Sequence, residues 1–232
     1  MIRVRHTPHC VEILDYLEQR HCFLIVMERL EGAKDLFDLI TERSMSTQAA
    51  TGLAEQVCRD YFRQIVEATL AIHELGVVHR DLKDENILVD VATGRLKLID
   101  FGAGAFCRDH VSRVKFSDFH GTRVYSPPEW ILGQCYYGDR AAVWSLGVLL
   151  FDMVYGDIPW EEDSDIVNCR LYSKKSFNAS RRVNNGEQRV AVSDAASSHV
   201  DDLIRKCLHI NQHERIKLED ILKHTWLRKS FA

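Results

Sequence analysis

The N-terminal part of the chain alternates short apolar runs with polar turns, a pattern that predicts strands. Residues 11–13 are apolar except for Glu12, residues 22–27 are apolar throughout, and the two runs lie on either side of a polar turn at residues 18–21. The second run is continuous, as is typical of a strand whose two faces are both covered. We therefore expect the chain to begin with two strands, the second of them buried, and to leave the second strand within residues 28–32.

A second pair of strands is predicted further along the chain. Residues 87–89 are apolar, residues 96–99 are apolar except for Lys97, and the two runs flank a short polar segment that contains Thr93 and Gly94. Two such runs joined by a short segment with glycine are typical of a β-hairpin.

Helical spacing dominates the region between these pairs of strands. Residues 35–40 predict a short helix, and the small, polar residues 44–51 predict a loop. A long helix follows, because apolar residues recur near helical spacing until Gly76, a typical helix stop. The apolar stripe of this helix consists of Leu53, Val57, Tyr61, Ile65, Leu70 and Ile72.

The C-terminal half is predicted to be helical, with one polar insertion. Residues 141–154 form the most apolar helix, which Gly156 ends, and residues 174–189 are polar and basic, which predicts a mobile insertion. Ser198 is expected to cap a further helix, and residues 218–223 predict the last one. The apolar residues of the capped helix are Val200, Leu203, Ile204 and Cys207.

The amino-acid composition mainly excludes certain partners and classes of protein. The 232 residues are 46% hydrophobic and include 30 Lys and Arg against 34 Asp and Glu, a net charge of −4. No nucleic-acid partner is expected, because such partners need a basic face. Residues 141–154 are too short to span a bilayer and residues 1–10 are too polar for a signal peptide, so no membrane partner is expected. Seven scattered cysteines favour reduced thiols in a protein of the cytoplasm or the nucleus. A monomer is also expected.

Residues 78–89 carry the first chemical signal. Asp81, Lys83 and Asn86 stand between two apolar runs at the spacing H-R-D-L-x-x-x-N of a protein kinase catalytic loop. Phosphoryl transfer needs a proton acceptor near the attacking hydroxyl, a cation on the moving phosphate and oxygen ligands for Mg²⁺. The three residues are of the right types, although a polar turn between two strands would explain the motif alone.

Two further motifs follow in order. Asp100, Phe101 and Gly102 come directly after residues 96–99 and match the magnesium motif D-F-G at the usual distance downstream. A carboxylate at a strand end can meet a metal that bridges phosphates. Residues 121–130 then stand where protein kinases carry A-P-E.

The chain resembles the protein kinases and, in finer detail, the Pim serine/threonine kinases, from about Val11 to Trp226. The finer resemblance includes Asp84 in place of the usual catalytic-loop proline and Ala142 in place of a usual aspartate. It also rests on residues 35–43, 79–88, 98–102, 121–131, 141–147 and 156–159. The resemblance implies an α+β, kinase-like fold with ATP and Mg²⁺ as cofactors, which phosphorylates serine or threonine in proteins.

The resemblance also assigns roles to single residues. Asp81 would be the catalytic base, Lys83 would steady the γ-phosphate, and Asn86 and Asp100 would hold Mg²⁺. The residues expected at the ATP are Glu28, Leu30, Asp35, Glu85, Asn86, Leu88 and Asp100. Thr122 would position the substrate, and arginines upstream of the target hydroxyl would meet Asp35, Asp38, Glu85, Asp152 and Asp157. The alternative is that these acids lie on ordinary solvated faces.

Two ion pairs are expected on the same grounds. Arg80 should pair with Asp118 without phosphorylation; the alternative is a solvated Asp118 and a phosphate on Ser112, Ser117 or Thr122. Glu129 and Arg215 should form a buried pair that braces the helical lobe; the alternative is a surface pair of little worth.

Protein kinases also use a Gly-rich loop and a strand lysine to hold the phosphates, and neither precedes Glu28 in this sequence. We therefore expect residues 1–28 to be the remnant of an N-terminal lobe, its strands four and five. Residues 29–232 should then form the hinge and the C-terminal lobe. The alternative function is a non-catalytic interaction module that keeps the substrate platform.

Overall fold

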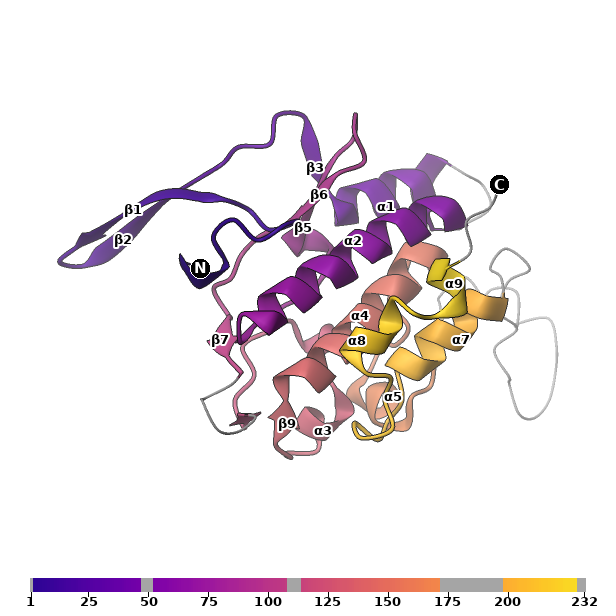
Figure 1. Ribbon diagram of the computed structural model, residues 1–232. Coiled ribbons are helices and arrows are strands. Elements are labelled where there is room, and N and C mark those ends of the chain that lie inside the picture. The colour runs from indigo at the N-terminus through magenta and orange to yellow at the C-terminus, as the bar shows by residue number, and fades with distance from the viewer. Residues whose placement is uncertain (1, 47–51, 108–113, 172–197, 229–232) are drawn as a thin grey trace, which may run out of the picture.

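The computed structural model describes residues 2–46, 52–107, 114–171 and 198–228, and it begins with an antiparallel hairpin. A short turn of 3₁₀-helix, η1 (Ile2–Val4), precedes strands β1 (Ile13–Gln19) and β2 (Cys22–Met27). Figure 1 shows the hairpin projecting from the helical body. The prediction for β2 has the right bounds. The predicted first strand is present, but its bounds are wrong: β1 begins at Ile13 and continues through the polar residues Asp15, Glu18 and Gln19, whose side chains are exposed to solvent.

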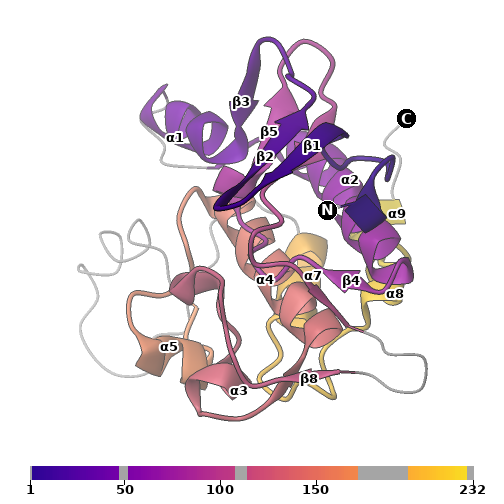
Figure 2. The same cartoon turned by 90° about the vertical axis from the view of Figure 1, so that its left-hand side faces the viewer.

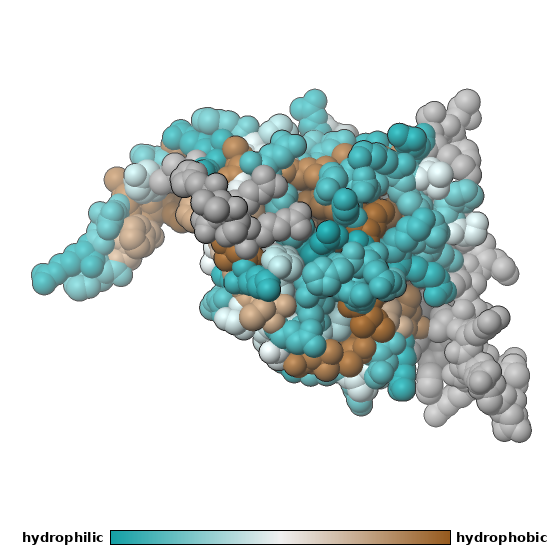
Figure 3. All heavy atoms as spheres, turned by 60° about the horizontal axis from the view of Figure 1, so that its bottom comes forward, coloured by the Kyte–Doolittle hydropathy of each residue, from teal (hydrophilic) through white to brown (hydrophobic). Residues whose placement is uncertain are grey.

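The expectation that residues 22–27 are covered on both faces is also wrong. All residues of β2 are exposed, from 68% for Phe23 to 44% for Met27. Apolar side chains follow the projecting arm in Figure 3. Within the described ranges, β1 is the strand that pairs with β2, so the hairpin leaves an apolar surface in contact with solvent.

A three-stranded antiparallel sheet joins this arm to the helices. It has the order β3 (Ala33–Asp35), β5 (Ile87–Asp90) and β6 (Leu96–Leu98). The predicted hairpin is confirmed, and Gly94 adopts the positive φ of 68° that the reversal between β5 and β6 requires. The chain entering β1 lies along β6, where the Val11 N–H donates to the Leu98 carbonyl at 2.9 Å.

Helices α1 (Leu36–Ser46) and α2 (Glu55–Glu74) follow β3. The Asp35 carboxylate accepts the Asp38 N–H at 2.7 Å and so caps α1. Helix α1 continues through residues 44–46, which were predicted as loop, and residues 47–51 of that loop lie outside the described residues. Helix α2 stops before Gly76, as predicted, but its buried stripe is only partly the predicted one: Cys58, Phe62, Ile65, Val66, Ala68, Thr69 and Ile72.

Helix α4 (Gly138–Tyr155) is the centre of the helical body. It is buried over most of its length, and Gly156 ends it with a φ of 71°, as predicted. Helices α2 and α7 (Ser198–Cys207) pack against it (Figures 1 and 2). This packing encloses the core, because α2, α4 and α7 each contribute fully buried apolar residues.

Shorter elements complete the described fold. They are β4 (Val77–Val78), η2 (Asp84–Asn86), β7 (Ala105–Phe106), β8 (Lys115–Phe116), η3 (Arg123–Tyr125), α3 (Pro128–Ile131), β9 (Tyr136–Tyr137), α5 (Asp163–Asn168), α8 (Leu218–Ile221) and α9 (Thr225–Arg228). The predicted last helix is thus confined to α8, and Ser198 is the first helical residue of α7. The predicted insertion at residues 174–189 lies outside the described residues.

The architecture is α+β, as predicted, with small antiparallel sheets on a mainly helical body. None of the helices in the described part of the chain is long and apolar enough to cross a bilayer.

Candidate active site

The Asp81 carboxylate is held from two directions. Its Oδ1 accepts the Thr122 N–H at 2.8 Å and the Thr122 hydroxyl at 2.9 Å. Its Oδ2 accepts the Asn86 side-chain amide at 3.0 Å, and the same amide donates to the Asp81 carbonyl at 2.8 Å. Three of the predicted site residues, two from one loop and one from the segment before η3, therefore meet around one carboxylate.

His79 anchors the loop that carries Asp81. Its ring is 1% exposed, its Nε2 donates to the Ile99 carbonyl at 2.8 Å, and its Nδ1 accepts the Asp81 N–H at 3.3 Å. Burial lowers the pKa of His79, which favours the neutral ring that this pair of hydrogen bonds requires. The ring also packs edge-on against Phe101, with centroids 4.7 Å apart, so the loop is fixed to the strand that leads to Asp100.

Lys83 lies beside the Asp81 carboxylate. Its Nζ is 3.9 Å from Asp81 Oδ2, and it forms a close ion pair with Glu85. Burial would lower the pKa of Lys83, but the Glu85 hydrogen bond and the Asp81 and Glu85 charges raise it, so the side chain stays a cation. A fixed cation next to a carboxylate suits a phosphate that moves toward a hydroxyl.

Asn86 and Asp100 are suitable donors for Mg²⁺. Asn86 uses its amide nitrogen toward Asp81, which leaves its side-chain oxygen as a donor. Asp100 follows β6 with a φ of 56° and accepts the Gly102 N–H at 3.0 Å on Oδ1. Mg²⁺ takes few protein oxygens and completes its shell with phosphate and water. Oxygen donors from two residues, one from Asn86 and one or both from the Asp100 carboxylate, fit that habit.

Four of the residues predicted to contact the nucleotide lie just after β2 or on the paired strands β3 and β5. Asp35 and Leu88 are paired across β3 and β5, and Asp38 is exposed on α1 next to Asp35. Glu28 and Leu30 lie just after β2, where the Glu28 carbonyl and the Leu30 N–H make no backbone hydrogen bond within the described residues. A free acceptor and a free donor two residues apart suit the edge of a purine base.

Arg80 and Asp118 are in contact, as predicted. Arg80 Nη1 is 3.3 Å from Asp118 Oδ2, and His120 Nε2 is 2.6 Å from the same oxygen. Hydrogen bonds from the backbone, from His120 and from Arg80 hold the pKa of Asp118 below its usual value. The Arg80 guanidinium also donates to the Ala103 carbonyl at 2.6 Å, so it joins the segments on both sides of residues 108–113.

Asp152 was predicted to face the substrate, and the structure buries it. Asp152 is only 5% exposed. Its carboxyl group is hydrogen-bonded to the carboxyl group of Asp84, which is 6% exposed. The Tyr125 hydroxyl donates to Asp84 Oδ1 at 3.1 Å. Burial raises the pKa of Asp84, and burial and the two carboxylates raise that of Tyr125. The buried position argues against a direct substrate role for Asp152; Asp157 is half-buried and accepts the Ile158 N–H at 2.9 Å.

The expected pair of Glu129 and Arg215 is confirmed as a buried one. The guanidinium binds the carboxylate with two parallel bonds, Nη1 to Oε1 at 3.0 Å and Nη2 to Oε2 at 2.9 Å. The side chains are 4% and 0% exposed. Arg215 also donates to the Arg140 and His209 carbonyls, so the pair fixes the start of α3 to the chain before α8.

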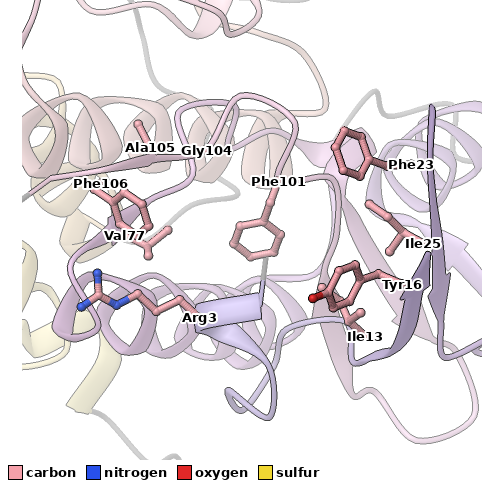
Figure 4. A pocket seen from close by; sticks show the side chains of 10 residues that line it. All are labelled: Arg3, Ile13, Tyr16, Phe23, Ile25, Val77, Phe101, Gly104, Ala105 and Phe106. Carbon is pink, nitrogen blue, oxygen red and sulfur yellow. The ribbon is translucent and has the colours of Figure 1, made fainter. Parts of the chain in front are cut away.

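A cavity of about 730 Å³ lies beside this site, between the hairpin and the strand after Asp100 (Figure 4). The Phe101 ring points into it, and none of the residues around Asp81 lines it. Its lining residues are Arg3, Ile13, Tyr16, Phe23, Ile25, Val77, Phe101, Gly104, Ala105 and Phe106.

Comparison with known proteins gives a family. A profile of the protein kinase domain matches residues 1–227. The chain is 46% identical to serine/threonine-protein kinase pim-2 of Danio rerio over 221 residues. This aligned region covers 95% of the chain and 62% of that protein. It is 39% identical over 219 residues to serine/threonine-protein kinase prk-2 of Caenorhabditis elegans, covering 94% of the chain and 44% of that protein. The chain thus spans less than two thirds of the length of these relatives.

Proposed function

Because the chain belongs to the protein kinase domain family, we propose that it transfers the γ-phosphate of ATP to serine or threonine hydroxyls of proteins. The observation that carries the proposal is the setting of Asp81. Thr122 and Asn86 fix its carboxylate, and the Lys83 ammonium lies 3.9 Å away. A positioned carboxylate beside a cation is what proton removal from a hydroxyl next to a phosphate requires.

Each residue of the loop then has a separate task. Asp81 accepts the proton of the attacking hydroxyl and keeps its orientation through Thr122. Lys83 offsets negative charge on the transferred phosphate. When bound, Mg²⁺ would neutralise phosphate charge, and Asn86 and Asp100 would hold it.

The proposed substrates are proteins with arginines upstream of the target hydroxyl. Asp38 and Glu85 are exposed to solvent and Asp35 is half-buried. Carboxylates that a substrate can reach therefore lie both in the segment after the hairpin and in the catalytic loop. Such carboxylates bind the planar guanidinium group with paired hydrogen bonds. Opposite charges also steer a cationic peptide toward the site, an effect that salt weakens.

A peptide array measures this preference. We expect Asp38→Asn together with Glu85→Gln to lower the ratio of arginine-rich to acidic peptide phosphorylation by about tenfold. Asp35→Ser should act in the same direction and, because serine also caps helices, should leave α1 intact. Glu42→Gln, on the same helix but paired with Lys34, is the matched control. An unchanged ratio in the double variant contradicts the proposed substrate class.

The affinity of the 232-residue chain for Mg-ATP is the second measurement. Without a Gly-rich loop or a strand lysine, the phosphates meet only Lys83 and the Mg²⁺ ligands. We expect calorimetry to give a Kd of about 1 mM or weaker. Micromolar binding would mean that another group holds the phosphates.

The alternative function is a non-catalytic interaction module. An extended form of the protein, which also carries a lobe that binds the ATP phosphates, distinguishes the two functions. That lobe can come from any in-frame coding sequence before Met1 or be fused from a relative. Phosphotransfer by this extended form supports the enzyme, whereas peptide binding without phosphotransfer supports the module.

A further inference from the structure

Lys97, a side chain from β6, contacts the base of the β1–β2 hairpin. Lys97 Nζ lies 2.7 Å from Glu28 Oε1 and donates to the Cys10 carbonyl at 3.2 Å. The same Glu28 oxygen accepts the Glu12 N–H at 2.8 Å. Lys97 therefore contacts both the chain that enters the hairpin, at Cys10, and the chain that leaves it, at Glu28.

This ion pair differs from an ordinary surface pair. The Lys97 and Glu28 side chains are 27% and 26% exposed, whereas those of Lys34 and Glu42 are 43% and 58% exposed. Burial would raise the pKa of Glu28, but the hydrogen bonds from Lys97 and from the Glu12 backbone outweigh it, so the pKa is lowered. A partly shielded pair with two additional backbone hydrogen bonds holds its geometry better than a solvated one.

The pair also lies at a place where geometry matters. Lys97 is on β6, the strand that leads to Asp100, and its neighbour Leu98 bonds to the backbone of His9 and Val11. Glu28 begins the segment that carries the Glu28 carbonyl and the Leu30 N–H, two groups without a backbone hydrogen bond in the part of the chain that the structure describes. The hairpin projects into solvent (Figures 1 and 3), so contacts at its base set its orientation.

We propose that Lys97 is a positioning residue, which fixes the segment after β2 relative to the strand that leads to Asp100 through its contacts with Glu28 and Cys10. The nucleotide part of this inference rests on the proposed function. There, Lys97 would set the distance between the base-binding backbone at Glu28 and Leu30 and the metal ligand Asp100.

Hydrogen exchange of the 232-residue chain tests the fastening without any nucleotide. Lys97→Met keeps most of the side-chain volume and removes the cation, and Glu28→Gln keeps the shape and removes the anion. We expect each to speed exchange of the β1–β2 ladder by about tenfold, with no further increase in the double variant, because both remove the same contact. Lys97→Arg should restore slow exchange, and the matched control pair, Lys34→Met and Glu42→Gln, should leave it unchanged.

Adenosine binding followed by NMR supplies the second readout. We expect Lys97→Met to weaken it and Lys97→Arg to restore it, in parallel with the exchange rates. Unchanged exchange in Lys97→Met, or faster exchange with unchanged adenosine binding, overturns the proposal. If the unaltered chain binds no detectable adenosine, the nucleotide part of this inference fails, and the exchange rates alone decide whether Lys97 fastens the hairpin.

Discussion

Replacing Asp81 with asparagine is expected to lower the phosphotransfer rate by about 10²-fold or more. The amide has the shape of the carboxylate, so Thr122 can still bond to one of its atoms, but it cannot accept the proton of the attacking hydroxyl. The rate is measured with Mg-ATP and an arginine-rich peptide, on the form that carries a phosphate-gripping lobe. Binding of the peptide and the thermal midpoint should change little, because the substitution leaves the packing around His79 untouched.

A matched control is available for this substitution. Asp90 also accepts hydrogen bonds from its own turn, including the Thr93 hydroxyl at 2.6 Å, but it lies at the far end of β5. Asp90→Asn should therefore retain the full rate. Near wild-type turnover by the purified Asp81→Asn variant would show that Asp81 is not the catalytic base, and it would contradict the proposed mechanism.

Breaking the pair of Glu129 and Arg215 is expected to cost about 3–5 kcal/mol of unfolding free energy. Glu129→Gln leaves a guanidinium that is 0% exposed without its countercharge. The Arg140 and His209 carbonyls still accept hydrogen bonds from it, but they carry no full charge. Urea unfolding of the 232-residue chain, followed by circular dichroism, measures the loss.

The exposed pair of Lys34 and Glu42 provides the control for this second substitution. Its members are joined at 2.6 Å, a shorter contact than in the buried pair, yet both side chains are largely in water. Glu42→Gln should cost no more than about 1 kcal/mol, because solvent replaces the lost partner. Equal losses in Glu129→Gln and Glu42→Gln would show that burial does not set the value of the Glu129 pair.

Much of the candidate site could be predicted from the sequence, because its central contacts are local. Asp81, Lys83 and Asn86 lie within six positions, and the geometry of one loop brings them together. The contact between Arg80 and Asp118 spans 38 residues and was reached through the resemblance to the Pim kinases, not through local pattern. Neither the local pattern nor the resemblance indicated a role for Lys97. In the sequence of the β5–β6 hairpin it has the pattern of an ordinary polar strand residue that faces outward.

The errors have a common physical origin. The apolar run at residues 22–27 was expected to be covered, but hydrophobicity records only that burial would be favourable, not that a covering element exists. Asp152 was expected to face the substrate, but α4 turns it toward Asp84 and Tyr125 inside the body. At both positions, whether a side chain is buried or exposed depends on other parts of the chain that pack around it.

Features that depend only on neighbouring residues were already fixed by the order of amino acids. Gly76, Gly94 and Gly156 adopt positive φ angles that end α2, reverse the hairpin and end α4, because glycine has no Cβ to oppose them. Contacts between groups that are far apart in the chain depend instead on how the whole chain packs. Thr122 binds Asp81 across 41 residues and Arg215 binds Glu129 across 86, and Lys97 reaches Glu28 from a different strand. Such contacts are set by how the helices and sheets pack, and packing depends on surfaces contributed by the whole chain.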